Sequence, residues 1–111
     1  HAGFGLVKPG PDTTDAEARA ICETSFVGTL RALKAARPYL LQTATAHPDG
    51  PNHLLICSSS AADFAPPCYG VYAATKAAQA MIAGAMRAEV RRENLLVSSV
   101  HPVGTETEFF A

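Results

Sequence analysis

Two short apolar runs constrain the fold of this chain most strongly. Residues 53–58 (HLLICS) and 95–100 (LLVSSV) each follow turn-forming residues. Continuous apolar runs of this length are typical of strands buried on both faces of a sheet. Between them, the alanine-rich stretch from Val71 to about Arg92 predicts a helix. A strand, a helix and a second strand in this order predict a parallel βαβ unit.

A longer helix is expected before the first strand. Thr14 and Glu17 have the spacing of a capping box, and apolar residues then recur with a helical period to about Thr43. Pro38 lies inside this stretch and predicts a kink or an early end of the helix. Residues 59–70 are expected to form a loop. The predicted element order is therefore helix, strand, helix, strand.

The chain is too short to form a complete open sheet of this kind. It has 111 residues, whereas six strands at about 30 residues per βαβ unit need roughly 180 residues. We therefore expect an α/β fold that is part of a Rossmann-like, doubly wound parallel sheet. A longer chain or partner chains would complete it, because two strands alone would leave apolar edges exposed.

Composition excludes several classes of partner. Nine Lys and Arg against ten Asp and Glu give a net charge of −1, which argues against nucleic acid or an anionic membrane as the main partner. No run approaches the roughly 18 apolar residues of a membrane helix. The four histidines and three cysteines show no metal-ligand spacing. Three cysteines are also too few for a disulfide scaffold, so a cytoplasmic location is expected.

The residues suited to chemistry lie around the first strand and the helix that follows it. Tyr72 and Lys76 are four residues apart and share one helix face. A free phenol has a pKa near 10, and a neighbouring ammonium favours the phenolate. Ser59 follows the strand at the sheet end where open α/β folds bind ligands. Its hydroxyl could hold a substrate oxygen, or it could only end the strand and cap a turn. The pair of Tyr72 and Lys76 could likewise be a surface lysine beside a half-buried tyrosine.

In type and order, these residues resemble the short-chain dehydrogenase/reductase family. The family signature is a Ser after the fifth strand, followed by Tyr-x-x-x-Lys at the start of the next helix, as at Ser59, Tyr72 and Lys76. Three further segments match in the same order, and the resemblance spans essentially the whole chain. They are Ala2-Gly3 (an Asn-Ala-Gly turn), Glu23-Thr24-Ser25 (a Glu-x-Asn-like helix segment) and residues 102–107 (a Pro-Gly-x-x-x-Thr stretch).

The resemblance implies hydride transfer between NAD or NADP and a small-molecule carbonyl or secondary alcohol. By this resemblance Tyr72 is the general acid/base, Lys76 lowers its pKa and binds the nicotinamide ribose, and Ser59 orients the substrate oxygen. Ser25 completes the implied catalytic set. The implied cofactor-binding residues are Ala2, Gly3, Tyr72, Lys76, Pro102, Val103, Thr105 and Thr107. The two threonines would hold the nicotinamide carboxamide, and the Ala-Gly pair would border the adenosine side.

The chain departs from the family pattern at three positions. His1 stands in place of Asn, and Ser25 stands in place of the helix Asn that supports the Lys through a bound water. Val103 replaces a Gly that lets the backbone pass close to the nicotinamide. No Gly-rich phosphate-binding turn can be drawn. In the family that turn lies upstream, so we expect residues 1–111 to be a partial NAD(P)-binding domain, from the end of strand four to just after strand six.

Two other functions compete with this interpretation. A non-catalytic relative would keep the fold for nucleotide binding or as a scaffold. A hydrolase would use Ser59 with Lys76 as its base, although the Gly-x-Ser-x-Gly turn of such enzymes is missing. The family commonly forms dimers through its two long helices. Here those helices either build a homo-oligomer or pack within one subunit.

Overall fold

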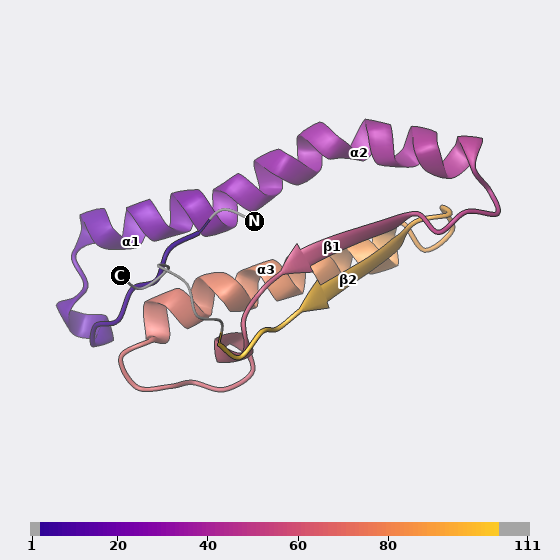
Figure 1. Ribbon diagram of the computed structural model, residues 1–111. Coiled ribbons are helices and arrows are strands. Elements are labelled where there is room, and N and C mark those ends of the chain that lie inside the picture. The colour runs from indigo at the N-terminus through magenta and orange to yellow at the C-terminus, as the bar shows by residue number, and fades with distance from the viewer. Residues whose placement is uncertain (1–2, 105–111) are drawn as a thin grey trace.

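The computed structural model describes residues 3–104 and confirms the expected order of elements (Figure 1). The helices and strands are α1 (Asp15–Cys22), α2 (Gly28–Ala46), β1 (His53–Cys57), α3 (Gly70–Glu89) and β2 (Leu96–Val100). A π-helical segment, Glu23–Val27, joins α1 to α2, so the two run on as one long helix. Short 3-10 turns occur at Gly10–Asp12 and Ser60–Ala62.

The two strands pair in parallel, as the βαβ pattern predicts. The register runs from His53 opposite Leu96 to Cys57 opposite Val100. Ile56 and Val97 point toward the helices and form the main core. The buried residues packed with them come from α3 and the turn after it, and half-buried leucines of α2 join the cluster: Ala83, Met86, Val90, Leu95, Leu33, Leu40 and Leu41. Both long helices therefore contribute to the core on one face of the sheet.

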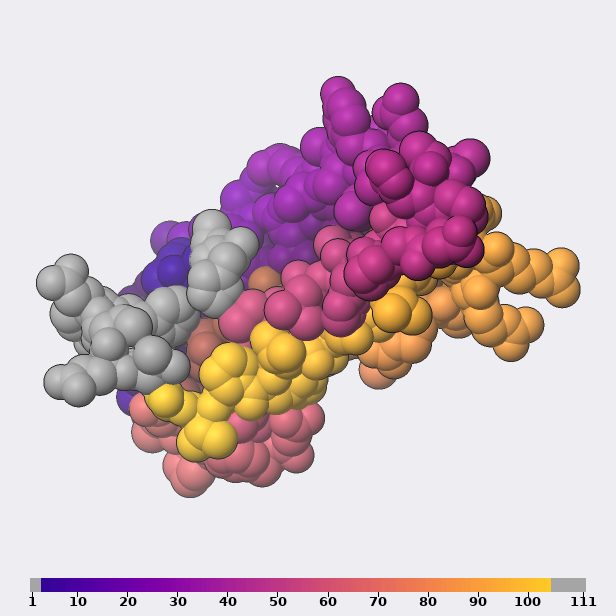
Figure 2. Space-filling view, turned by 45° about the vertical axis from the view of Figure 1, so that its right-hand side comes forward, coloured from indigo at the N-terminus to yellow at the C-terminus, as the bar shows by residue number. Residues whose placement is uncertain are grey.

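The expectation that both strand faces are buried is wrong for this chain. Side chains alternate along a strand, and those opposite the helices are exposed. Leu55 is 56% exposed and Leu96 is 63% exposed. Figure 2 shows the two strands side by side at the surface. The apolar runs indicate a second covering layer, but the described residues contain no element that supplies one.

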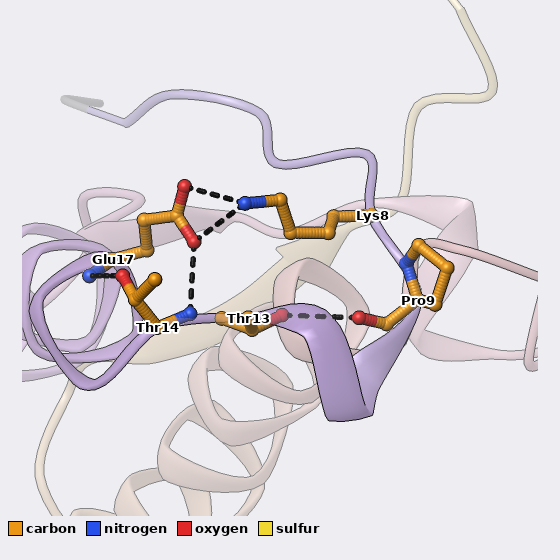
Figure 3. Close-up of polar contacts among 5 residues, drawn as sticks. All are labelled: Lys8, Pro9, Thr13, Thr14 and Glu17. Carbon is orange, nitrogen blue, oxygen red and sulfur yellow. Dashed lines mark hydrogen bonds and ion pairs between the residues drawn. The ribbon is translucent and has the colours of Figure 1, made fainter.

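The N-terminus of α1 is capped as the sequence predicts (Figure 3). The Glu17 backbone N–H donates to Thr14 Oγ1 at 3.2 Å, and Glu17 Oε2 accepts from the Thr14 N–H at 2.9 Å. The ammonium of Lys8 lies 2.8 Å from Glu17 Oε1. The backbone N–H of Lys8 donates to the Cys68 carbonyl at 2.7 Å, so the N-terminal segment is held between α1 and the loop before α3.

Pro38 does not end the helix, which continues to Ala46. Proline removes one backbone donor, that to the carbonyl of residue 34. Pro38 and Lys34 are exposed, so water can take that carbonyl. The departure from α geometry occurs instead at Glu23–Val27, where the Gly28 N–H donates to the Glu23 carbonyl, five residues back.

The described part of the chain is elongated. Its principal extents are 49 × 25 × 25 Å and its radius of gyration is 15.6 Å, against about 13 Å for a compact chain of this length. Within residues 3–104, no helix combines the length and the apolar character needed to span a membrane.

Candidate functional site

Tyr72 and Lys76 lie on the first turns of α3 and are both 6% exposed. The Lys76 ammonium nitrogen is 5.9 Å from the centre of the Tyr72 ring. A lysine at the surface beside a half-buried tyrosine is therefore not what the structure shows. The pair is buried together, and a charge in this position acts on the phenol more strongly than it would in water.

Burial lowers the pKa of Lys76, because desolvation disfavours the ammonium form. The ammonium donates a long hydrogen bond of 3.5 Å to the carbonyl of Cys57 at the end of β1. Ser58 fixes the helix to the same strand end, since its hydroxyl donates to the Lys76 carbonyl at 2.7 Å. The remaining donor capacity of the ammonium is available to a ligand.

Ser59 is the second residue after β1 and is 8% exposed. Its Oγ accepts a hydrogen bond from the Ala61 N–H at 3.2 Å and caps the turn Ser60–Ala62. The turn-capping interpretation is therefore correct, but it is compatible with the catalytic one, because a hydroxyl that accepts can still donate its proton. Among the described residues, no hydrogen bond links Ser59 to Lys76.

Tyr72 belongs to a second apolar cluster that brings three parts of the chain together. Ile21 from α1, Ala61 from the turn after β1, and Ala73 from α3 are buried around it. Leu6 from the N-terminal segment packs against the same cluster. The N-terminal segment therefore reaches the cluster that surrounds Tyr72.

The segment after β2 is tied to the turn after β1. The Ser60 N–H donates to the Pro102 carbonyl at 3.0 Å. The His101 imidazole lies between Asp63, at 2.8 Å from Nδ1 to Oδ2, and Ser99, at 3.0 Å from Nε2 to Oγ. The carboxyl ends of both strands thus meet at one edge, where open α/β sheets bind ligands.

Ser25 is completely buried in the π-helical segment. Its carbonyl accepts from Thr29 Oγ1 at 2.7 Å and from Gln79 Nε2 at 2.9 Å. Among the described residues, no hydrogen bond joins Ser25 to Lys76 directly. Gln79 connects the two regions, because it lies three residues after Lys76 on α3 and is also buried.

Gln79 is not among the site residues that the sequence motifs predict. A signal for it exists, since residues 72, 76, 79, 83 and 86 follow one helical face, and a glutamine on the buried face of an alanine-rich helix needs polar partners. Its partner, the carbonyl of Ser25, depends on the π-helical segment, which the sequence pattern does not indicate.

The predicted cofactor residues fall partly within the described chain. Gly3, Pro102 and Val103 are described, whereas Ala2, Thr105 and Thr107 lie outside the described residues. Val103 is 89% exposed. Among residues 3–104, no group of three or more His, Cys, Asp or Glu side chains is placed to hold a metal ion.

Comparisons with known proteins agree with this architecture. Residues 1–111 match the family model described as short chain dehydrogenase, whereas a search of curated protein sequences gave no match. A short chain dehydrogenase from Burkholderia cenocepacia J2315 in complex with NADP is 29% identical, with a TM-score of 0.85 over 98% of this chain and 45% of that chain.

Two structures with lower sequence identity to this chain show only that the fold is shared. The 3-ketoacyl-(acyl-carrier-protein) reductase from Brucella melitensis, complexed with NADH, is 20% identical with a TM-score of 0.89 over 98% of this chain and 46% of that chain. A gluconate 5-dehydrogenase from Burkholderia cenocepacia J2315, in complex with NADP and tartrate, is 21% identical with a TM-score of 0.87 over 98% and 40%. The chain is thus Rossmann-like and spans less than half the length of each of these proteins.

Proposed function

Because this chain belongs to the short-chain dehydrogenase family, we propose that it forms part of an NAD(P)-dependent oxidoreductase acting on a small-molecule carbonyl or secondary alcohol. The observation that carries the proposal is the buried pair of Tyr72 and Lys76, whose ammonium reaches the Cys57 carbonyl at the end of β1, two residues before the buried Ser59. Residues 1–111 are then a partial NAD(P)-binding domain. Further residues of a longer chain or of partner chains supply the phosphate-binding turn and the covering layer.

In this proposal, the three side chains act on one substrate oxygen. Tyr72 exchanges a proton with it, as general acid in reduction and as general base in oxidation. The hydroxyl of Ser59, whose lone pair already caps the turn, donates to the same oxygen. The buried ammonium of Lys76 stabilises the phenolate that Tyr72 forms after it gives up its proton.

The residues at the strand ends suit a nicotinamide nucleotide. Lys76 can donate to ribose hydroxyls, since its one hydrogen bond to the described residues is long, and Pro102 and Val103 follow β2 at the same end of the sheet. We include Gly3 in the set because of its place in the sequence. Ala2, Thr105 and Thr107 extend this set in the sequence. When bound, the nicotinamide supplies or accepts the hydride. The relatives complexed with NADP and with NADH support NAD or NADP as the cofactor.

The location and the assembly are part of the same proposal. Cys22, Cys57 and Cys68 are all free thiols, which suits a reducing, cytoplasmic compartment.

Leu30 of α2 is 43% exposed and Met81 of α3 is 75% exposed. An apolar hollow of about 330 Å³ lies beside the start of α3. These apolar surfaces support a homo-oligomer that forms through the two long helices. Sedimentation of the native polypeptide tests this, because Met81→Glu should dissociate the oligomer.

The direct test is turnover by the native polypeptide that carries residues 1–111, using a panel of ketones and aldehydes with NADH or NADPH. Tyr72→Phe should lower the rate by about 10²–10⁴-fold, because it removes the general acid. Tyr39→Phe is the matched control, since Tyr39 is 72% exposed on α2, and it should keep the full rate.

Two results would contradict the proposal. Equal rates for Tyr72→Phe and the wild type would remove the tyrosine from the mechanism. Saturable NAD(P)H binding without turnover of any carbonyl compound or alcohol would favour the non-catalytic alternative, a nucleotide-binding or scaffold protein.

A further inference from the structure

The short 3-10 turn after β1 is held at both ends by the chain that follows β2, which passes beside it in Figure 1. At the start of the turn, the Ser60 N–H donates to the Pro102 carbonyl at 3.0 Å. At its end, the Asp63 carboxylate lies 2.8 Å from Nδ1 of His101. The Asp63 N–H closes the turn by donating to the Ser60 carbonyl at 2.9 Å. One backbone carbonyl and one imidazole side chain therefore hold the two ends of the same turn.

The imidazole of His101 is held on its other side by the strand that it follows. Its Nε2 lies 3.0 Å from Ser99 Oγ on β2. A carboxylate can only accept, so Nδ1 carries a proton and donates to Asp63. Nε2 accepts from the Ser99 hydroxyl when the ring is neutral and donates to it when the ring is protonated. His101 is thus a bridge from β2 to the end of the turn, and both of its hydrogen bonds can form in either protonation state.

The direction of the Ser59 side chain depends on this turn. Ser59 is the N-cap of the turn, and its Oγ accepts from the Ala61 N–H at 3.2 Å. Its carbonyl accepts from the Ala62 N–H at 3.0 Å. The two N–H groups that fix the serine therefore belong to the turn whose far end is fixed by Asp63. A shift of that end moves both N–H groups relative to the Ser59 hydroxyl.

The contact between His101 and Asp63 is too exposed to contribute much to the stability of the whole fold. The side chains of the two residues are 25% and 58% exposed, and ion pairs at such surfaces have little effect on global stability. The consequence of the contact is therefore local. It lies in the geometry of a three-residue turn that begins directly after Ser59.

We propose that His101 and Asp63 are positioning residues, which hold Ser59 in the direction in which its hydroxyl meets the substrate oxygen. Neither residue touches the substrate, because each acts through the turn. The bridge itself rests on the four hydrogen bonds that join β2, the imidazole and the turn. Its effect on turnover rests on the proposed function.

The first test does not depend on turnover. It is the hydrogen exchange of the Ala61 N–H, the donor to Ser59 Oγ, in the native polypeptide. Asp63→Ala should speed this exchange about three- to tenfold, because one hydrogen bond that holds the turn is lost. Asp63→Asn keeps an acceptor for Nδ1–H and should keep most of the protection. Asp49→Ala is the matched control in the exposed turn before β1. Unchanged exchange of Ala61 in Asp63→Ala overturns the proposal.

The histidine has a matched partner in the same sheet. His53 Nε2 lies 2.9 Å from Ser98 Oγ, much as His101 Nε2 lies 3.0 Å from Ser99 Oγ. His53 begins β1 at the opposite end of the sheet, however, whereas His101 also reaches Asp63. His101→Phe, which keeps a ring without its nitrogens, should speed the exchange of the Ala61 N–H, and His53→Phe should not. Equal exchange in the two variants contradicts the bridge.

The positioning role is tested by a double-mutant cycle with Ser59. In the native polypeptide, Asp63→Ala should lower kcat about tenfold, because a misdirected hydroxyl loses its contact with the substrate oxygen. Asp63→Asn should restore most of the rate. In a Ser59→Ala background, Asp63→Ala should have no further effect on kcat, since it acts through that hydroxyl. An additive loss in the double variant overturns the positioning role. Should Asp63→Ala fail to fold, His101→Phe serves in the same cycle.

Failure of this inference and failure of the proposed function look different. Exchange of the Ala61 N–H that responds to Asp63 and His101, in a polypeptide without turnover, supports the bridge and contradicts the oxidoreductase. Turnover with the same kcat in Asp63→Ala and the wild type supports the oxidoreductase and contradicts the inference.

Discussion

At the scale of single residues, burial determines the chemistry of Lys76. Its ammonium is packed between α3 and the end of β1, where its hydrogen bond to the Cys57 carbonyl is long. The pKa of Lys76 is lowered by desolvation. A lysine in this state acts on Tyr72 through a weakly screened charge, and it retains donors for a ligand.

The lowered pKa of Lys76 makes stability depend on pH in a defined direction. The folded-state pKa lies below the ordinary value of 10.5, so the unfolded chain binds more protons between the two values, and stability rises with pH there. Lys76→Met should lose this rise, whereas Lys34→Met, on the exposed part of α2, should keep it. Urea unfolding of the native polypeptide between pH 7 and 10.5 measures the difference. Parallel curves for the wild type and Lys76→Met would contradict the burial of the charge.

The hydroxyl of Ser59 has two effects that substitutions can separate, one on turnover and one on the turn that it caps. Ser59→Ala should lower turnover by about 10²–10³-fold, because one donor to the developing charge on the substrate oxygen is lost. It also removes the cap on Ser60–Ala62. Ser59→Thr keeps the hydroxyl and should restore most of the rate. Full activity in Ser59→Ala would show that the serine only caps the turn.

At the scale of elements, the start of α1 carries a pH-dependent cap. The ion pair with Lys8, followed by the hydrogen bond to the backbone of Thr14, lowers the pKa of Glu17. A lowered pKa means that the carboxylate stabilises the helix end above the ordinary value of 4.5 and loses this effect as pH falls through the lowered pKa. Glu17→Gln keeps the capping acceptor but should show no such transition. Helicity of residues 15–20, from Cα chemical shifts between pH 2 and 7, measures it, and identical profiles would contradict the cap.

The other half of this capping box, the hydroxyl of Thr14, can be tested against a matched control, Thr13. Thr14→Ala should destabilise α1 by about 1 kcal/mol, because the N–H of Glu17 loses its acceptor. Thr13→Ala should cost less, since Thr13 makes only a 3.4 Å contact with the Pro9 carbonyl. Amide exchange of residues 17–20 compares the two variants, and equal protection would contradict the capping role of Thr14.

Elements with local sequence signals were predictable, and those without were not. The capping box, the alanine-rich helix and the two strands are patterns of neighbouring residues, and each appears within a few residues of its expected bounds. The π-helical segment carries no local sequence signal, and the Ser25 carbonyl within it accepts from Gln79, 54 residues away in the sequence. Pro38 suggested an early end because the pattern does not show that its helix face is exposed to water.

The candidate site, too, could be predicted from the sequence only in part. Ser59, Tyr72 and Lys76 were identifiable from type and spacing, because the βαβ order places a strand end and a helix start together. Their burial could not be predicted from the pattern, which is equally compatible with a surface lysine. Gln79 lies on the buried face of its helix, but its hydrogen bonds to Ser25 and Thr29 follow only from the fold.

At the scale of the whole molecule, the sheet has one covered and one open face. The elongated shape and the exposure of Leu55 and Leu96 fit a layer that is covered in a larger domain. In the native polypeptide, Leu55→Asp should therefore destabilise the fold by about 2 kcal/mol or more, since the apolar burial of a leucine is lost. Tyr39→Asp should cost little. Denaturant unfolding measures both, and equal small effects would mean that this face stays open to solvent.

The central claim is hydride transfer at Tyr72, and isotope transfer tests it most directly. The native polypeptide is incubated with NADH or NADPH deuterated at C4 of the nicotinamide and with the carbonyl panel, and the products are analysed by mass spectrometry. We predict deuterium on the carbinol carbon of a product alcohol in the wild type, and its loss in Tyr72→Phe. Binding of the cofactor without deuterium in any product would contradict the account.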